Sequence, residues 1–322
     1  MEPFLLCAFP LSCNKYTGLL YQLVKPFIQL AFFFFYKKIV VKNKHLLQTK
    51  GPLLLTVNHP NALLDALVIG LLFKQPIHFL TRGDAFNKSW KRKLLSRLNM
   101  IPVYRLRDGI ENLHLNEYAF AKSIEVLQNN GIVLIFIEGI CKHTHELQPF
   151  KKGAARIAFN CWHAGIPLRV MPVSIRYHSL YAYGKHIQVH LQNSFSKKQL
   201  SKHTDDAKNY IFFNSILFEQ LSLQLNQSVS FESSSTSWLK MLQLLGKWLH
   251  YPVYIPVQKW VVAKTSGTVF YDSILFAALI IVYPFYLIVI AFFLHYIGLH
   301  FITILTIIFS YLLLALIAIK TK

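Results

Sequence analysis

The C-terminal part of the chain holds a long run without any charged side chain. Between residues 273 and 319 there is no Asp, Glu, Lys or Arg. A helix needs about 20 apolar residues to cross the hydrocarbon core of a bilayer, and residues 273–294 and 301–319 both suit that length. His295, Gly298 and His300 mark a turn between them. The run therefore predicts that residues 271–322 form a two-helix transmembrane hairpin.

The charges that flank this run predict its orientation. Lys259 and Lys264 precede the first span, Lys320 and Lys322 follow the second, and the turn between the spans has no Lys or Arg. Positively charged flanks stay in the cytoplasm. We therefore expect an integral membrane protein whose remaining domain lies on the cytoplasmic face, and a bacterial inner membrane is the expected location.

The overall charge predicts the class of partner. The chain has 34 Lys and Arg against 14 Asp and Glu, which gives a formal net charge of +20, and 54% of its residues are hydrophobic. A basic surface attracts anionic phospholipids, phosphorylated substrates or nucleic acid. Because basic residues beside apolar spans are drawn to anionic leaflets, we expect membrane lipids as partners and no nucleic acid.

Two further segments show features of membrane contact. Within the N-terminal region, residues 1–44, the apolar stretch 16–36 is interrupted by Gln22, Lys25, Pro26 and Gln29, which predicts a shallow or re-entrant membrane helix. Residues 228–270 begin with a serine-rich linker, and an apolar stripe at helical spacing follows. The stripe consists of Trp238, Met241, Leu242, Leu245, Trp248 and Leu249. It is typical of an interfacial amphipathic helix, and packing in a core explains it equally well.

The central residues, 45–227, have the alternating pattern of an α/β domain. Short apolar runs at 53–57, 77–81, 101–105, 132–137 and 168–177 predict strands. Helical patterns lie between them. Residues 112–130 form one, closed by Gly131, and residues 154–161 form another, with Gly165 as its C-terminal stop.

The stretch TVNHPNALLDALVIG, residues 56–70, carries the strongest indication of chemistry, because a predicted strand runs into a predicted helix there. On one regular helix His59 and Asp65 would lie about 120° apart, so they meet only if His59 lies in the turn before the helix. From that turn the carboxylate can fix the tautomer of the imidazole while the other ring nitrogen removes a proton. No Ser or Cys stands beside the pair, so we expect the hydroxyl of an acceptor to be the nucleophile. Backbone N–H groups at the start of the helix are the expected donors to the oxyanion.

Two other interpretations apply to residues in this part of the chain. Taken alone, a histidine before an apolar helix is more often a hydrogen-bonded structural residue than a catalyst. A zinc site is the second alternative, because thiolates and imidazoles at close spacing bind zinc; the residues concerned are Cys141, His143, His145, Cys161 and His163. Their spacing matches no zinc module, and we expect no metal.

Blocks of sequence downstream decide between these interpretations. Asn58-His59 with Asp65 comes first, RGDAF (82–86) and IPVYR (101–105) follow, FIEG (136–139) and FKKGAARIA (150–158) come next, and MPV lies within residues 170–174. In this order, residues 45–195 resemble the glycerol-phosphate acyltransferase family, which includes the lysophosphatidic acid acyltransferases. The resemblance implies an α/β acyltransferase domain with a mixed sheet flanked by helices.

The resemblance also implies roles for individual residues. His59 and Asp65 become the catalytic pair, Arg105 the expected ligand of the acceptor phosphate, and Glu138 with Gly139 part of the acceptor site. The full set of expected substrate-binding residues is Arg82, Arg105, Glu138, Gly139, Lys151 and Lys152. An arginine can bind phosphate through two parallel hydrogen bonds, and a helix N-terminus after two lysines also favours anions. For the two lysines, a solvated surface is an equally good explanation.

Some positions depart from the family's usual pattern. Five residues separate His59 from Asp65 where four are common, which resembles the branch that includes glycerol-3-phosphate and dihydroxyacetone-phosphate acyltransferases. Ile137 stands where Pro is usual, and Ile140-Cys141 where Thr-Arg is usual. The acceptor arginine therefore has no counterpart at Cys141, although Lys142 can supply a charge nearby.

The sequence thus predicts an O-acyltransferase of phosphatidic acid and phospholipid biosynthesis. It would use no cofactor and would transfer a fatty-acyl group from acyl-CoA or acyl carrier protein to glycerol-3-phosphate or 1-acylglycerol-3-phosphate. The alternative is a catalytically silent lipid-binding membrane protein with the same fold, and the intact His59 and Asp65 argue against it.

Overall fold

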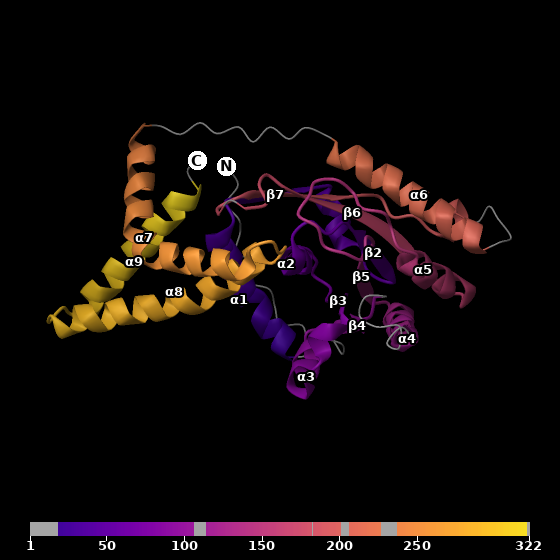
Figure 1. The fold of residues 1–322 in the computed structure, drawn as a ribbon, viewed down its shortest axis with the longest axis horizontal. Coiled ribbons are helices and arrows are strands. Elements are labelled where there is room, and N and C mark those ends of the chain that lie inside the picture. The colour runs from indigo at the N-terminus through magenta and orange to yellow at the C-terminus, as the bar shows by residue number, and fades with distance from the viewer. Residues whose placement is uncertain (1–18, 106–113, 182, 201–205, 227–236, 321–322) are drawn as a thin grey trace.

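The protein is built around a mixed sheet. A computed structural model describes residues 19–105, 114–181, 183–200, 206–226 and 237–320. Its described part contains a 7-stranded sheet with helices on both faces, and a group of long helices extends to one side (Figure 1). The predicted α/β fold with a mixed sheet flanked by helices is confirmed. The serine-rich linker expected at the start of residues 228–270 lies almost entirely outside the described residues.

The strand order places the predicted catalytic segment in the middle of the sheet. The strands are β1 (Lys38–Lys42), β2 (Leu53–Val57), β3 (Ile77–Arg82), β4 (Met100–Val103), β5 (Ile132–Phe136), β6 (Arg169–Tyr177) and β7 (His186–Leu191). Their order is β1-β7-β6-β2-β5-β3-β4. Only β6 and β7 pair antiparallel; the other neighbours in this sheet are parallel. β2 therefore runs between two parallel partners, β6 and β5.

The sequence predicts five of the strands and misses the other two. The strands expected at 53–57, 77–81, 101–105, 132–137 and 168–177 are all present, with small shifts at their ends. β1, KIVVK, has a lysine at each end, and it lies within the residues 1–44 assigned to a membrane-associated region. β7, HIQVHL, alternates polar and apolar residues and includes two histidines. β1 pairs with β7, and β7 pairs with both β1 and β6. These pairings between distant residues place the two strands in the sheet, and short apolar runs do not reveal them.

Helices cover both faces of the sheet. On one face lie α1 (Leu19–Phe35) and α2 (Ala62–Leu72), and on the other lie α4 (Leu115–Gln128), α5 (Gly153–His163) and α6 (Asp206–Leu225). Leu53, Leu55 and Val57 of β2 belong to the core beneath the first pair, while Leu54 belongs to the core beneath the second group. Burial on both faces explains why β2 has an almost unbroken apolar sequence.

Shorter elements complete the domain. The basic helix α3 (Ser89–Arg97) connects β3 to β4, and 3₁₀ turns occur at η1 (Lys44–Gln48), η2 (Gly83–Phe86) and η5 (Lys197–Gln199). Gly165 follows α5 with a φ angle of +74°, a left-handed conformation that suits glycine at a helix end. The predicted stop of this helix is therefore present.

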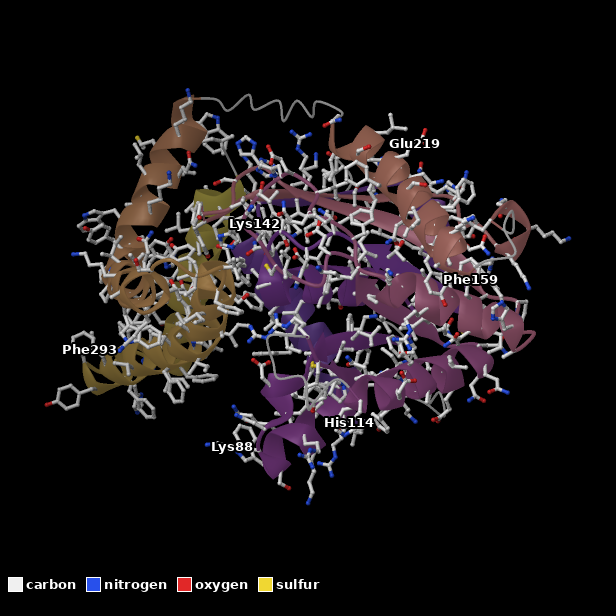
Figure 2. The ribbon with its side chains drawn as sticks, turned by 45° about the vertical axis from the view of Figure 1, so that its right-hand side comes forward. Lys88, His114, Lys142, Phe159, Glu219 and Phe293 are labelled. Atoms are coloured by element: carbon white, nitrogen blue, oxygen red, sulfur yellow. The ribbon has the colours of Figure 1, made fainter. Side chains whose placement is uncertain are left out.

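Long helices form the C-terminal part of the molecule. They are α7 (Ser237–Thr265), α8 (Tyr271–Tyr296) and α9 (Phe301–Lys320), and they pack against one another. α8 and α9 are long and apolar enough to cross a membrane. Phe293, near the outer end of α8, lies at the edge of the molecule away from the sheet (Figure 2). The predicted pair of apolar helices is confirmed, and its length and composition suit a hairpin associated with a membrane.

Both ends of this hairpin are attached to the sheet domain. Leu275 and Phe276, in the first turns of α8, belong to the same core as α1 and α2, and the ring of Phe276 contacts that of Phe32 edge-on at 5.0 Å between centroids. At the other end, Lys320 Nζ donates to the carbonyl oxygen of Tyr36 at 2.7 Å. The hairpin thus leaves the domain and returns to it on the same side.

α7 buries polar residues and exposes apolar ones. Gln243 and His250 are buried, and their side chains meet carbonyl groups of α9. Trp238, Met241 and Trp248 of the predicted stripe are 61%, 70% and 74% exposed. The stripe does not fill a core, so that interpretation is wrong. An apolar outer surface with polar contacts between helices is the arrangement that a lipid environment favours.

Gly246 sets the distance between α7 and α9. A Cβ atom on Gly246 would lie 2.5 Å from the carbonyl oxygen of Leu314 and 3.0 Å from the Cβ of Ala318. Gly246→Val should force the two helices apart at a cost of about 1–3 kcal/mol, and we expect a lower unfolding temperature in detergent. Met241→Val, on the exposed side of the same helix, is the matched control. Equal unfolding temperatures for the two variants would contradict close packing of these helices.

Candidate active site

The topology gathers the predicted polar residues at one edge of the sheet. His59 lies two residues after β2, Glu138 two residues after β5, and Arg105 two residues after β4, while Arg82 is the last residue of β3. These strands are parallel, with Val57 opposite Phe136 and Arg82 opposite Val103. Their carboxyl ends therefore meet at the same edge, where open α/β sheets bind ligands.

His59 and Asp65 are in direct contact. His59 lies in the turn between β2 and α2, and Asp65 lies in the first turn of α2. The Nδ1 atom of His59 is 2.9 Å from the Oδ2 atom of Asp65. The sequence predicts this placement, because the side chains can meet only with His59 outside the helix. That the pair catalyses a reaction stays a prediction at this point.

Asp65 is a buried charge with several hydrogen-bond donors. Its side chain has no exposure to solvent. Besides His59, the backbone N–H of Asn61 donates to its Oδ2 atom at 2.7 Å, and the hydroxyl of Tyr177 donates to its Oδ1 atom at 2.8 Å. Its place in the first turn of α2 also sets it near the positive end of the helix dipole. These contacts fix the carboxyl group of Asp65 beside Nδ1 of the imidazole.

The imidazole of His59 is held on one face and open at one edge. Its ring stacks on Phe136, with centroids 3.7 Å apart and planes 11° from parallel. The His59 side chain is 17% exposed. With Nδ1 assigned as the donor to Asp65, Nε2 is the nitrogen that can accept a proton from a substrate.

The turn that carries His59 is fixed to neighbouring strands. The amide of Asn58 donates to the carbonyl oxygen of Ile175 at 3.0 Å and accepts from the N–H of the same residue at 2.8 Å. The N–H of Lys142 donates to the carbonyl oxygen of His59 at 3.3 Å. The turn that carries His59 is therefore bound both to β6 and to the loop after β5.

The start of α2 differs from the oxyanion site that the sequence predicts. The N–H of Asn61 donates to the carboxyl group of Asp65, and the N–H of Ala62 donates to the sulfur of Cys141 at 3.0 Å. Ala62 has a φ angle of +47°, an uncommon conformation for a residue with a side chain, of the kind found at functional sites. These two N–H groups hold the turn in shape instead of facing a substrate.

Glu138 lies beside the turn that carries His59. It is 3% exposed, and burial raises the pKa of its carboxyl group to about 7, although hydrogen bonds from the backbone of Gln148 and His59 oppose the shift. Gly139, next in the chain, has a φ angle of +65°, and a Cβ there would lie 2.9 Å from the Cγ of Lys151. Glu138 and Gly139 thus shape the loop against which His59 packs, and burial keeps Glu138 away from the surface.

The predicted cationic residues occupy different surroundings. Arg82 donates through Nε to Oδ1 of Asp84 at 3.0 Å, and its guanidinium lies 5.9 Å from the centre of the Phe270 ring. Arg105 is half-buried. Lys151 and Lys152 are exposed just before α5, and Lys151 lies beside Gly139. The structure therefore brings Arg82, Arg105 and Lys151 toward the edge that holds His59.

The alternative zinc site is not assembled. Cys161 is buried in the core on the α4–α6 face, whereas the thiol of Cys141 contacts the start of α2. Within the described ranges of the chain, no three His, Cys, Asp or Glu side chains lie close enough to hold a metal ion. Burial and the charge of Asp65 raise the pKa of the Cys141 thiol to about 12, so this sulfur stays protonated and is no nucleophile at neutral pH.

Several residues of the site are missing from the sequence prediction. Tyr177 closes a predicted strand, and nothing local indicates that its hydroxyl reaches Asp65. Asn61 belongs to the stretch 56–70, but its side chain donates a hydrogen bond of 2.6 Å to Asp272, a residue far away in the sequence. Asp272 is the last charged residue before the uncharged run, and this position is the only local sign that it is special.

The middle of the chain matches a known protein family. Residues 38–176 match the family model described as acyltransferase. The solved structure of PlsC, the 1-acyl-sn-glycerophosphate acyltransferase of Thermotoga maritima, is 17% identical; the match covers 65% of this chain and 81% of that chain, with a TM-score of 0.47. No match was found among curated proteins.

The matched residues contain β1 to β5, nearly all of β6, and the turn that holds His59. Residues 38–176 therefore form a domain similar to the acyltransferase family, built on a sheet with mostly parallel strands.

The buried carboxyl of Glu138 predicts a pH-dependent stability. Its pKa is raised from the ordinary value of 4.5 to about 7, so between these pH values the folded chain binds more protons than the unfolded chain, and stability falls as the pH rises. Relative to Glu138→Gln, the wild-type protein should lose up to about 3 kcal/mol between pH 4.5 and 7. Unfolding temperatures across this window measure the effect.

Glu146→Gln is the control for this experiment, because Glu146 is exposed. It should follow the wild-type curve throughout. Parallel pH curves for Glu138→Gln and the wild type would show that Glu138 does not titrate as its burial requires.

Proposed function

We propose that this acyltransferase transfers a fatty-acyl group from a thioester, acyl-CoA or acyl carrier protein, to a hydroxyl of a glycerol-phosphate acceptor. The observation that carries the proposal is the contact between Nδ1 of His59 and the fully buried Asp65 at 2.9 Å. Asp65 takes part in three hydrogen bonds, one of them with the ring of His59, and these contacts orient the imidazole. His59 is then suited to act as a general base through Nε2.

In the proposed reaction, Nε2 of His59 removes the proton from the acceptor hydroxyl. The oxygen attacks the thioester carbonyl carbon, and Asp65 stabilises the imidazolium that forms. The tetrahedral intermediate then collapses: the carbon–sulfur bond breaks, and the thiolate takes the proton from His59. The products are an ester and a free thiol, and neither a cofactor nor a covalent acyl-enzyme is needed.

The charge and the hairpin favour a phosphorylated acceptor at a membrane. Arg82 and Arg105 follow neighbouring strands at the edge that holds His59, and the chain has a formal net charge of +20. The hairpin α8–α9 attaches to the domain at both ends, which would keep the site close to the bilayer surface. Lys259, Lys264 and Lys320 flank the two apolar helices and favour a cytoplasmic domain.

Removing the imidazole tests the proposed base. His59→Ala should lower kcat for acyl transfer to glycerol-3-phosphate by on the order of 10³-fold, because general base catalysis is lost. A radiolabelled acyl donor and the purified protein in detergent provide the assay. His45→Ala, a substitution at an exposed position before β2, should leave the rate unchanged. Full activity of His59→Ala would remove His59 from the mechanism, and an inactive wild-type protein across donors would favour the lipid-binding alternative.

Removing a cation tests the acceptor site. Arg105→Gln should raise KM for a phosphorylated acceptor by about 10- to 100-fold, because a charge-assisted contact to phosphate is lost. Glycerol-3-phosphate, dihydroxyacetone phosphate and 1-acylglycerol-3-phosphate form the acceptor panel, and the best of them identifies the natural class. Arg97→Gln, at the exposed end of α3, removes the same charge and should leave KM unchanged. Equal KM values for the two variants would exclude Arg105 from acceptor binding.

A further inference from the structure

The first turn of the membrane hairpin reaches the catalytic turn. Asp272 follows Tyr271, the first residue of α8, and is only 1% exposed. Its Oδ2 atom accepts a hydrogen bond from the side-chain amide of Asn61 at 2.6 Å. Asn61 has no exposure to solvent and lies between His59 and α2. A residue more than 200 positions away in the sequence therefore contacts the segment that carries the proposed base.

Asn61 joins two carboxylates through different groups. Its side chain donates to Asp272, while its backbone N–H donates at 2.7 Å to the Oδ2 atom of Asp65, the same atom that contacts Nδ1 of His59. Any rotation of the Asn61 peptide would move a donor of Asp65. The hydrogen bond to Asp272 thus restrains the orientation of the group that shares an acceptor with the imidazole.

Lys185 balances the charge of Asp272. The Nζ atom of Lys185, which precedes β7, forms an ion pair with Oδ2 of Asp272, and both side chains are 1% exposed. The ammonium also lies 5.7 Å from the centre of the Tyr177 ring, and Tyr177 donates to Asp65. A buried carboxylate without a partner would be costly, so the pair makes a charged residue at this position tolerable.

A general role in holding the hairpin does not explain this arrangement. At the end of α9, Lys320 attaches the hairpin to the carbonyl oxygens of Tyr36 and Lys37. At the start of α8, the ring of Phe276 attaches it to α1 through apolar contacts. A buried ion pair is weak evidence for stability. What distinguishes Asp272 from these contacts is the oxygen that it presents to Asn61.

We propose that Asp272 is a positioning residue for acyl transfer and that the hairpin α8–α9 is part of the active site as well as an anchor. Asp272 orients Asn61, and Asn61 fixes the position of the Asp65 carboxyl group relative to the His59 imidazole. This inference rests on the proposed role of His59 as general base. It extends the catalytic unit beyond the residues 38–176 that match the acyltransferase family.

Two double variants separate the hydrogen bond from the charge. Lys185→Met with Asp272→Asn removes the ion pair and keeps an oxygen for Asn61. Lys185→Met with Asp272→Leu removes the ion pair and the oxygen together. We expect the first to retain most of the wild-type kcat, and the second to lose at least about tenfold in kcat with less than about a twofold change in KM for either substrate. Lys320→Met, which weakens the hairpin at its other attachment, should match the wild type.

Each outcome tests whether Asp272 acts through its hydrogen bond with Asn61. Equal kcat values for the two double variants, or an equal loss in Lys320→Met, would overturn the proposal, because the charge pair or the general attachment would then account for the effect. If the double variants do not fold, Asn61→Ala removes the same hydrogen bond and leaves the Lys185–Asp272 pair in place. An unchanged kcat in Asn61→Ala would overturn the proposal as well.

A chemical measurement distinguishes this proposal from the proposed function. If His59→Ala kept full activity, the proposed mechanism would fail, yet the position of the ring could still be followed through the rate at which diethyl pyrocarbonate modifies His59. We expect His59 to be modified faster in the double variant that carries Asp272→Leu than in the double variant that carries Asp272→Asn. Equal rates would show that Asp272 does not hold the catalytic turn.

Discussion

One buried carboxylate organises the proposed active site. Asp65 accepts hydrogen bonds from the ring of His59, from the backbone of Asn61 and from the hydroxyl of Tyr177. These donors come from the turn after β2 and from the end of β6. Because a buried negative charge without donors would be strongly unfavourable, the turn and β6 must keep their positions relative to α2. The same requirement orients the imidazole.

The sheet and the C-terminal helix pair both contact the turn that carries His59. Parallel strands present His59, Glu138, Arg82 and Arg105 at one edge, since their carboxyl ends coincide. Asp272, in the first turn of α8, accepts a hydrogen bond from Asn61 of this turn. Because α8 begins within the core of the domain, the apolar helix pair and the proposed site are held together.

The strands that the sequence predicts are those with a local apolar pattern. β2 and β5 are short apolar runs, and such runs have few alternatives in a chain with helices between them. β1 and β7 are different, because the lysines at the ends of β1 and the histidines of β7 break the apolar pattern. Their strand conformation depends on the pairing of β1 with β7 and of β7 with β6; the first of these joins residues far apart in the sequence.

The sequence by itself determined where His59 must lie to meet Asp65, because on one regular helix the two side chains would lie apart and only the turn before α2 brings them together. It also determined the apolar pair of C-terminal helices, since a long uncharged run has few other solutions. Only the tertiary structure decided that Tyr177 and Asn61 would donate to Asp65, that the N–H groups at the start of α2 would be used internally, and that Asp272 would reach the catalytic turn. These contacts join distant segments, and local periodicity holds no information about which buried polar groups become partners.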